Sequence, residues 1–460
     1  MGWSVAHRTI WVVGLARSGC AAGLLLRDEG ARVVGIDDAD EAAVRRRWER
    51  EGLPTLAPRA FDEIHTGGGW PAEAPWAVVL SPGVPTDHPR LRALPRTVPV
   101  IGEMELAARY CPAPIVAVTG TNGKSTVTEW ITHLARAGGR RAEAVGNVGT
   151  PLSLLARELG PDDLAVAEVS SFQLETVTTF APRVGVVLNL APDHLDRYPD
   201  LAAYYAAKRV LADRVPADGA FVTWTACPEA RAWPTAARRV LFGDEAEGAQ
   251  VAWRGDRLVA QLPGGEADLV GRGDLQLTSP PNLINALASV AAAAAAGVPA
   301  DALAMGLKDF RGLPHRHQPV GRRGGVVFID DSKATNVHAV CGGLAGWQGQ
   351  VVLIVGGSGK GEDYAPLREV MGPVRHVVAI GQEGPAIAAV LRDLVPVTAA
   401  ASMDEAVATA ADLAEPDAAV LLSPACASFD MFANYHQRGE AFAAAALRAG
   451  AVPPGVKEQP

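Results

Sequence analysis

The sequence has few cysteines, no long apolar run and no surplus of basic residues, and each shortage excludes a class of protein. The five cysteines have no paired spacing, which argues against a disulfide framework or a zinc site and fits a reducing cytoplasm. The apolar segment from Thr9 to Ala16 is too short to cross a membrane and ends at Arg17. A net charge of −9 without a basic tail argues against nucleic acid as a partner.

The chain is long enough for several domains. Its 460 residues suggest about three domains, and 48% hydrophobic with 20% charged residues is ordinary for a globular protein. The sequence contains no signal peptide or lipidation motif, so we expect a cytoplasmic protein without a membrane span. The segments described next place the expected domains at residues 1–102, 103–312 and 313–460.

The most informative stretch begins at Ile115. A β-branched run, Ile115 to Val118, predicts a buried strand, and a Gly- and Asn-rich turn and a helix follow it. This layout binds phosphate, because backbone N–H groups and the helix N-terminus surround the anion. We expect Lys124 to reach the β- and γ-phosphates of ATP and Ser125 to bind Mg²⁺. The loop has two residues between Gly120 and the Gly-Lys pair, where the usual P-loop has four.

The first segment opens with a nucleotide-binding βαβ pattern. A strand from Thr9 to Val13 leads into Gly14-Leu-Ala-Arg-Ser-Gly19 and an apolar helix, and a second strand ends before Asp37. Ala16 stands where the dinucleotide fingerprint has its middle glycine, so this signal is weak by itself. We expect Asp37 to hold a ribose or sugar hydroxyl.

In the second segment, polar residues follow the ends of two further strands. Glu168 is placed like a Walker B carboxylate and is expected to bind Mg²⁺, and His194 is a candidate second metal ligand or substrate contact. Lys208, on a following helix, is by default a solvated lysine. Residues 217–273 predict several short strands in a peripheral sheet without chemistry.

The third segment predicts another open parallel sheet, with helices between strands that start at Val326, Val351, Val377 and Val420. Two of its strand ends carry lysine in short polar turns, Asp330-Asp-Ser-Lys-Ala-Thr-Asn336 and Gly356-Gly-Ser-Gly-Lys360, which favours anion binding. A later strand ends in Ser423-Pro-Ala-Cys-Ala-Ser-Phe429.

These motifs together resemble the Mur ligases and their folylpolyglutamate synthase relatives, which share the shortened loop Thr119-Gly-Thr-Asn-Gly-Lys-Ser-Thr126. The resemblance covers nearly the whole chain, and the Asp-Ser-Lys-Ala-Thr-Asn and Ser-Pro-Ala-Cys-Ala-Ser motifs point to the member that adds D-glutamate. The Asp-Asn-Pro-Arg motif expected of a diaminopimelate-adding relative is absent. Two departures are Ala16-Arg17 in the first loop and Tyr435, where relatives often have Phe.

The resemblance implies an α/β fold: a Rossmann-like N-terminal domain, a central P-loop-type parallel sheet and a Rossmann-like C-terminal sheet. It implies ATP-dependent coupling of D-glutamate to UDP-N-acetylmuramoyl-L-alanine by a monomer with two Mg²⁺ sites. The catalytic residues would be Lys124, His194 and a carbamylated Lys208; the metal ligands Ser125, Glu168, His194 and Lys208. The ATP set would be Gly120, Thr121, Asn122, Gly123, Lys124, Ser125, Thr126, Asn282, Asn285, Arg316, Asp331 and Lys333. The UDP-substrate set would be Gly14, Leu15, Ala16, Arg17, Ser18, Asp37, Ser81, Gly83, Asn147, Ser170 and Gln173. The D-glutamate set would be Thr335, Lys360, Ser428, Phe429 and Tyr435.

Three other interpretations remain open at this point. A folylpolyglutamate synthase would share the ATP loop, but the Gly-Leu-Ala-Arg-Ser-Gly opening argues against it. A P-loop switch or motor ATPase would hydrolyse ATP without needing an amino acid and a UDP-sugar. A nicotinamide dehydrogenase would use the opening βαβ unit and would bind a nicotinamide dinucleotide.

Overall fold

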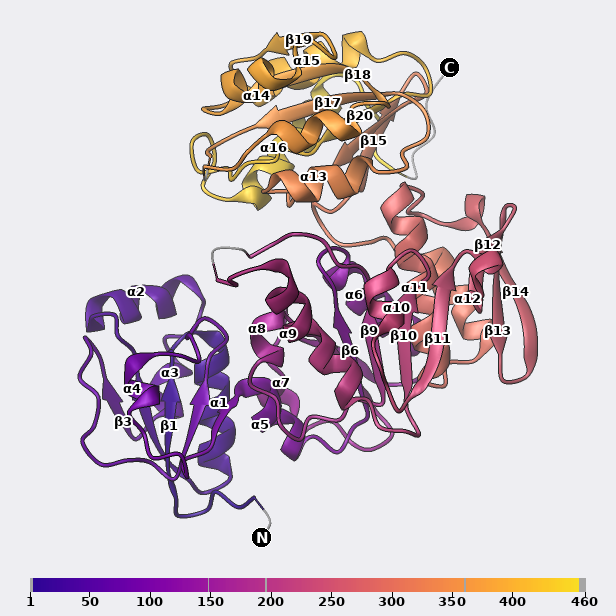
Figure 1. The fold of residues 1–460 in the computed structure, drawn as a ribbon. Coiled ribbons are helices and arrows are strands. Elements are labelled where there is room, and N and C mark those ends of the chain that lie inside the picture. The colour runs from indigo at the N-terminus through magenta and orange to yellow at the C-terminus, as the bar shows by residue number, and fades with distance from the viewer. Residues whose placement is uncertain (1–2, 148, 195–196, 360, 455–460) are drawn as a thin grey trace. The chain divides into compact units, whose positions relative to one another are not determined.

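The computed structural model describes residues 3–147, 149–194, 197–359 and 361–454, which contain three β-sheets (Figure 1). The chain divides into two compact units. One comprises Met1–Trp253, Val259–Leu269 and Ala288–Met305, and the other comprises Arg254–Leu258, Val270–Leu287 and Gly306–Pro460.

The N-terminal sheet has five parallel strands. Their order is β3 (Glu63–His65), β2 (Arg32–Ile36), β1 (Thr9–Val13), β4 (Ala77–Leu80) and β5 (Val100–Gly102). Val13 pairs with Ile36 on one side and with Leu80 on the other. Because the three central strands end in register, the loops that follow them leave the sheet at the same edge.

Helices cover this sheet on the side that carries Ile10, Val12 and Val33, and Trp11, Val34 and Val78 pack together on the other side. The alternation follows from the two-residue period of a strand. The helices of this region are α1 (Arg17–Asp28), α2 (Glu41–Arg50), α3 (Ala57–Ala60), α4 (Pro89–Arg92) and α5 (Glu103–Tyr110).

The central sheet has nine strands and is mixed. Their order is β14 (Gly265–Gly271), β13 (Arg257–Leu262), β12 (Val251–Arg254), β11 (Arg238–Gly243), β10 (Ala220–Trp224), β9 (Val184–Val187), β6 (Ile115–Thr119), β8 (Leu164–Glu168) and β7 (Ala142–Gly146). In the part of this order that runs from β12 to β7, each strand pairs in parallel with its neighbours. Residues 217–273 were predicted to form short strands of a peripheral sheet; they form strands, but these extend the main sheet, because β10 pairs directly with β9.

The helices of the central region connect these strands. They are α6 (Lys124–Ala137), α7 (Leu152–Leu155), α8 (Ser171–Leu174), α9 (Leu201–Arg214), α10 (Pro228–Ala232), α11 (Pro280–Ala295) and α12 (Ala300–Asp309), with short 3₁₀ turns η1 (Glu245–Glu247) and η2 (Arg272–Asp274). Helix α6 buries Trp130, Ile131 and Leu134 at helical spacing. In the alanine run that begins at Ala291, the first three residues are buried and the next three are partly exposed.

The C-terminal sheet has six strands in the order β15 (Gln318–Arg323), β16 (Val326–Asp330), β20 (Ala419–Leu422), β17 (Val351–Gly356), β18 (Val374–Ile380) and β19 (Val397–Ala399). The predicted strands pair in parallel, as expected, and β15, which was not predicted, adds to β16 in the antiparallel sense. The remaining strands pair in parallel.

Helices cover both faces of the C-terminal sheet. One hydrophobic cluster joins it to α13 (Val337–Leu344), the 3₁₀ segment η3 (Ala365–Val370) and α14 (Gly384–Leu391). A second cluster on the opposite face joins it to α15 (Met403–Leu413) and α16 (Tyr435–Arg448). The three sheets confirm the predicted α/β class. Within the residues that the structure describes, every helix is too short or too polar to cross a membrane.

Candidate active site

The predicted phosphate loop lies between β6 and α6. Gly123 has a φ of 84° at the start of α6, a left-handed conformation that strains any residue with a Cβ atom. The N–H groups of Thr121 and Asn122 donate to the backbone oxygen (3.0 Å) and side-chain Oδ1 (2.8 Å) of Asn189. Because Asn189 follows β9, the neighbouring strand fixes the shape of the loop.

Lys124 folds back over this loop. Its Nζ atom donates to the carbonyl oxygens of Gly120 at 3.0 Å and Thr121 at 2.8 Å. Both acceptors are backbone carbonyls of the loop itself. This cation lies where the sequence predicted the β- and γ-phosphates of ATP.

The two residues predicted to share a metal lie together. Ser125 Oγ donates to Glu168 Oε2 at 2.5 Å, and Asn147 Nδ2 donates to Glu168 Oε1 at 2.9 Å. Glu168 is only 2% exposed. Among the described residues, no group of three or more His, Cys, Asp or Glu side chains forms a metal-binding cluster. A metal here would therefore need hydroxyl, water or phosphate oxygens besides this carboxylate.

The structure also brings Lys208 to the loop. Its Nζ atom donates to the Gly120 carbonyl at 2.9 Å, and the residue is 2% exposed. Burial, together with the nearby charge of Lys124, lowers the pKa of the Lys208 amine well below its usual value. His194 is placed differently: its side chain is 44% exposed and its ring centroid lies 4.9 Å from that of Phe172.

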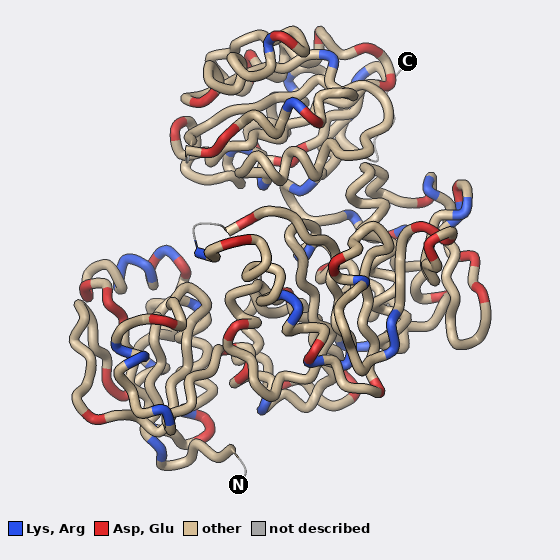
Figure 2. Tube along the Cα trace, viewed as in Figure 1, with Lys and Arg blue, Asp and Glu red and all other residues tan. Residues whose placement is uncertain are grey.

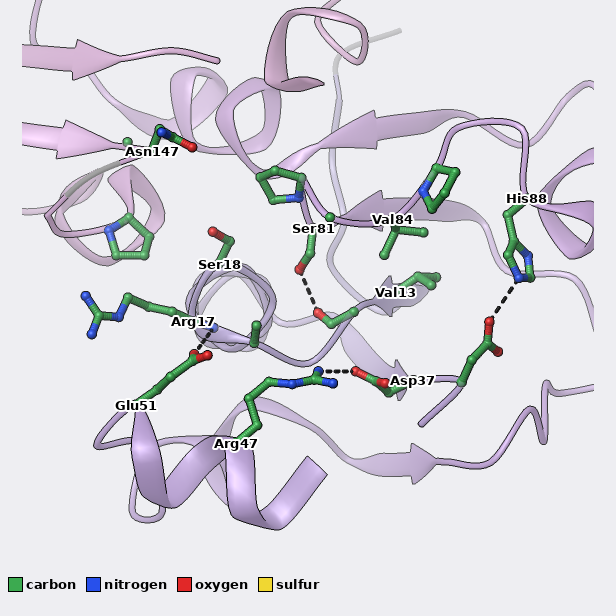
Figure 3. Close-up of a pocket in the computed structure, with 18 of the residues that line it drawn as sticks. Val13, Arg17, Ser18, Asp37, Arg47, Glu51, Ser81, Val84, His88 and Asn147 are labelled. Atoms are coloured by element: carbon green, nitrogen blue, oxygen red, sulfur yellow. Dashed lines mark hydrogen bonds and ion pairs between the residues drawn. The ribbon is translucent and has the colours of Figure 1, made fainter. Parts of the chain in front are cut away.

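A separate cavity of about 670 Å³ lies at the edge of the N-terminal sheet where β1, β2 and β4 end (Figure 3). Of the predicted UDP-substrate residues, it is lined by Gly14, Ala16, Arg17, Ser18, Asp37, Ser81, Gly83 and Asn147. Leu15 is buried behind it. Ser170 and Gln173 lie outside this lining and cap the start of α8, where Ser170 N donates to Gln173 Oε1 at 2.9 Å.

Asp37, which is predicted to hold a ribose or sugar hydroxyl, accepts three hydrogen bonds from the protein itself. Its Oδ2 atom accepts from Leu15 N at 3.0 Å and from Arg47 Nη1 at 2.7 Å, while Oδ1 accepts from Ala39 N at 3.0 Å. A carboxylate with these three donors first of all fixes the loop after β1. A sugar hydroxyl would have to use its remaining acceptor capacity.

The C-terminal strand ends hold a third group of predicted residues. Asp331 accepts from Ser423 Oγ at 2.8 Å, and burial raises the pKa of the Asp331 carboxyl. Lys333 Nζ lies 4.0 Å from the ring centroid of Tyr435, a cation–π contact.

The other predicted residues of this region are less closely associated. Thr335 follows Lys333 in the same turn, Ser428 is buried, and Phe429 is 74% exposed. Lys360 lies outside the described residues. On α11, Asn285 Nδ2 donates to Asn282 Oδ1 at 3.2 Å. The backbone N–H of Arg316 donates to Leu313 O at 3.4 Å.

Comparison with known proteins decides the family. The model of the Mur ligase middle domain matches residues 118–293, and the model of the Mur ligase glutamate ligase domain matches residues 315–426. The UDP-N-acetylmuramoylalanine–D-glutamate ligase of Anaeromyxobacter dehalogenans is 44% identical, over 94% of this chain and 96% of the relative. The enzyme of that name from Pelotomaculum thermopropionicum is 40% identical, over 95% and 96%.

The chain belongs to the Mur ligase family. Solved structures of Mur ligases share its fold. The MurF ligase of Thermotoga maritima in complex with ADP gives a TM-score of 0.59 at 15% identity, covering 97% of this chain and all of that one. The UDP-N-acetylmuramate-alanine ligase MurC of the same organism gives 0.56 at 19% identity, covering 96% and all of that chain. At these identities the likeness concerns the fold.

Sequence reasoning missed Arg438, which organises the C-terminal strand ends of this Mur ligase. Its guanidinium is 1% exposed and donates to Ser332 Oγ (3.0 Å), Ser332 O (2.9 Å), Cys426 O (3.0 Å) and Ala427 O (3.0 Å). Burial lowers the pKa of Arg438 to about 10. One side chain thus joins the turn after β16 to the turn after β20. An arginine in a polar helix start gives no sequence signal for this role.

Sequence reasoning also missed four charged or ionisable residues of the N-terminal cavity. Arg47 and Glu51 come from α2 and the residue after it, and Asp38 and His88 come from loops. His88 Nε2 lies 2.9 Å from Asp38 Oδ2, and the His88 ring stacks on Trp70 with centroids 5.1 Å apart. Acidic and basic positions are interspersed along the chain, so composition does not mark these residues (Figure 2).

Proposed function

We propose that this Mur ligase joins D-glutamate to UDP-N-acetylmuramoyl-L-alanine, with hydrolysis of ATP to ADP and phosphate, in cytoplasmic synthesis of peptidoglycan precursors. The observation that carries the proposal is the near-full-length similarity, at 44% and 40% identity, to two enzymes named for this reaction. The glycine-rich loop with Lys124, and the Ser125–Glu168 pair beside it, supply a phosphate-binding centre that such a ligase needs.

The chemistry requires activation of a carboxylate. A carboxylate does not react with an amine at neutral pH, because its oxygen is a poor leaving group. Transfer of the γ-phosphoryl group of ATP to the L-alanyl carboxylate forms an acyl phosphate, the D-glutamate amine attacks its carbonyl carbon, and phosphate leaves. Phosphoryl transfer is catalysed mainly by positioning and charge neutralisation. Lys124 supplies a positive charge at the loop for this purpose.

Two Mg²⁺ sites are part of the proposal. Ser125 and Glu168 fit the first, because a hydroxyl and a buried carboxylate that lie 2.5 Å apart are oxygen ligands of the kind Mg²⁺ prefers. Bound Mg²⁺ would neutralise phosphate charge during the transfer. His194 and Lys208 are the proposed residues of the second site. An ammonium cannot bind a cation, but the lowered pKa of Lys208 favours the neutral amine, which adds CO₂ and releases a proton to form an anionic carbamate.

The remaining assignments follow the same proposal. Residues 1–102 bind the UDP-substrate, residues 103–312 bind ATP, and residues 313–460 bind the amino acid. D-Glutamate has two carboxylates, and Lys360, Thr335, Ser428, the N–H of Phe429 and Tyr435 are the proposed contacts. Asn282, Asn285, Arg316, Asp331 and Lys333 are the proposed ATP contacts outside the loop. The enzyme is proposed to act as a monomer.

Phosphate release tests the proposal. The enzyme is mixed with ATP, Mg²⁺ and UDP-N-acetylmuramoyl-L-alanine, and D-glutamate, L-glutamate, D-glutamine or meso-diaminopimelate is added in turn. We expect rapid release with D-glutamate alone of the four. Release without an amino acid or a UDP-substrate would favour a simple ATPase, and preference for meso-diaminopimelate would reject the substrate assignment while keeping the ligase chemistry.

A further inference from the structure

Helix α2 attaches to the first glycine-rich loop through two neighbouring residues. Trp48 Nε1 donates to the Leu15 carbonyl at 2.6 Å. Arg47 Nη1 donates to Asp37 Oδ2 at 2.7 Å, and the same oxygen accepts from Leu15 N at 3.0 Å. The guanidinium of Arg47 is therefore held within two hydrogen bonds of the loop backbone.

The residue that follows α2 reaches the same loop one turn later. Glu51 Oε2 accepts from the backbone N–H of Arg17 at 3.1 Å, at the first residue of α1. Ala16 caps this helix without a side-chain hydrogen bond. Arg47 and Glu51 are four residues apart and so lie on one face of the helix, and both point toward the loop in Figure 3. Arg47 on α2 and Glu51 directly after it thus bring a cation and an anion to the cavity.

The guanidinium of Arg47 has more N–H donors than its hydrogen bond to Asp37 uses. A guanidinium carries five N–H donors, and within the described part of the chain the only hydrogen-bond partner of the Arg47 side chain is Asp37. The side chain is 27% exposed, and it lines the cavity. Asp37 also accepts from Leu15 N and Ala39 N, so its carboxylate stays fixed if Arg47 takes up a second partner.

The neighbouring Arg45 provides the contrast. It pairs with Glu41 on the same helix at 2.6 Å, but its side chain is 68% exposed and does not line the cavity. Such an exposed pair contributes little, typically about 0.3–0.5 kcal/mol within a helix. The two arginines lie two positions apart on the same helix, but Arg47 lines the cavity and Arg45 does not.

We propose that Arg47 is a positioning residue for the diphosphate of the UDP-substrate, and that Asp37 holds its guanidinium in place for this task. The inference deepens the proposed function and rests on it, since that function supplies the nucleoside diphosphate. Arginine suits the task because its planar fork can bind a carboxylate on one edge and a phosphate on another. The loop backbone, to which Asp37 ties the guanidinium, is where a diphosphate approaches a βαβ unit.

Binding of UDP and of uridine to four proteins tests this inference. Titration calorimetry measures the affinity for UDP, and ligand-observed NMR measures the affinity for uridine. Both are applied to the wild type, Arg47→Met, Arg47→Lys and the control Arg45→Met. Loss of a charge-assisted contact predicts roughly tenfold to hundredfold weaker UDP binding by Arg47→Met. We expect unchanged uridine binding in that variant, an intermediate UDP affinity for Arg47→Lys, and wild-type affinities for Arg45→Met.

The possible outcomes distinguish failure of the role proposed for Arg47 from failure of the proposed function. If Arg47→Met weakens UDP and uridine equally, Arg47 only supports the fold through Asp37, and the inference is wrong. If it binds UDP like the wild type, the inference is wrong while the proposed function stands. If the wild type itself binds NADP⁺ in preference to UDP, both fail. Circular dichroism and thermal unfolding of each variant show whether the fold is kept.

Discussion

The two glycine-rich loops of this Mur ligase hold their cations in different ways. At the central loop, Lys124 and Lys208 both donate to the carbonyl of Gly120, at 3.0 and 2.9 Å. At the N-terminal loop, Arg47 pairs with Asp37, and a second carboxylate, Glu51, accepts from the first N–H of α1. At the central loop one carbonyl accepts from both lysines, whereas at the N-terminal loop carboxylates accept from Arg47 and from the first N–H of α1.

This difference has an electrostatic consequence. Two lysines that share one carbonyl repel each other, which together with burial lowers the pKa of Lys208. The central loop therefore brings two lysine side chains to one carbonyl, an arrangement that suits a triphosphate. The N-terminal loop is close to neutral, so an anionic ligand there must compete with the protein's own carboxylates. Loss of a cation should therefore weaken function at either loop, whereas loss of the carboxylate Glu51 should strengthen anion binding at the N-terminal loop.

Loss of Lys124 should have the largest effect. Lys124→Ala removes a charge from the loop where phosphoryl transfer is proposed, and removal of one such donor typically lowers kcat by about a hundredfold to a thousandfold. Phosphate release measures the loss. UDP binding by the variant serves as the control, because Lys124 does not line the N-terminal cavity. Near-normal turnover of a folded variant would show that this loop is not the site of transfer.

Loss of Lys208 should have the next largest effect. Removal of a group that supports a metal site typically lowers activity by about tenfold to a hundredfold, and we expect that for Lys208→Ala, with partial recovery on adding acetate. Carbon-13 NMR after addition of labelled bicarbonate should give a carbamate signal in the wild type that is missing from the variant. Because the charge of Lys124 helps to lower the pKa of Lys208, Lys124→Ala should weaken the signal at a fixed pH. A signal that persists in Lys208→Ala would assign it to another amine.

A substitution at Gly19, in the first turn of α1, should lower stability and weaken binding of the UDP-substrate but not of ATP. A Cβ atom at Gly19 would lie 1.9 Å from Gly14 O and 2.9 Å from Ser81 Oγ, so α1 must shift. Such overpacking costs about 1–3 kcal/mol of stability. We expect Gly19→Ala to lower Tm and to weaken UDP binding, with little change in ATP binding. Gly160→Ala is the control, because the nearest atom to its Cβ would be 3.8 Å away. Equal loss of ATP and UDP binding would show that the loops are not independent.

The strands around both loops could be predicted because they are short β-branched runs bounded by glycine or polar residues. The pairing of distant strands could not. Gln318–Arg323 contains Pro and Gly and gives no strand pattern, yet it pairs antiparallel with β16 as the first strand in the order of its sheet. Residues 217–273 were recognised as strands, but local sequence carries no information about which sheet they join.

The residues of the candidate site also divide into those that the sequence predicts and those that it does not. Lys124 and Ser125 could be predicted because they occupy fixed positions in a strand–turn–helix motif. Arg47 and Arg438 could not, since Arg47 is one of four arginines in α2 and Arg438 is one of two in α16. Their roles depend on burial: Arg438 is 1% exposed, whereas Arg45 has a side chain that is 68% exposed. Tertiary packing, rather than local sequence, selects which of these side chains faces a loop.

Loss of Glu51 should have the smallest effect and the opposite sign. Glu51→Gln keeps an oxygen that can accept from Arg17 N but removes the negative charge from the start of α1. An anion at a helix N-terminus is worth about 0.3–1 kcal/mol, so this variant should be less stable by that amount without ligand. It should bind UDP about twofold to fivefold more tightly, because the diphosphate no longer displaces a charged competitor. The gain in UDP affinity should shrink as salt rises, since the Glu51 side chain is not fully buried.

Calorimetry at two salt concentrations measures the UDP affinity of Glu51→Gln, and thermal unfolding of the same samples measures its stability. Weaker UDP binding by Glu51→Gln would mean that Glu51 orders Arg17 for the substrate instead of competing with it.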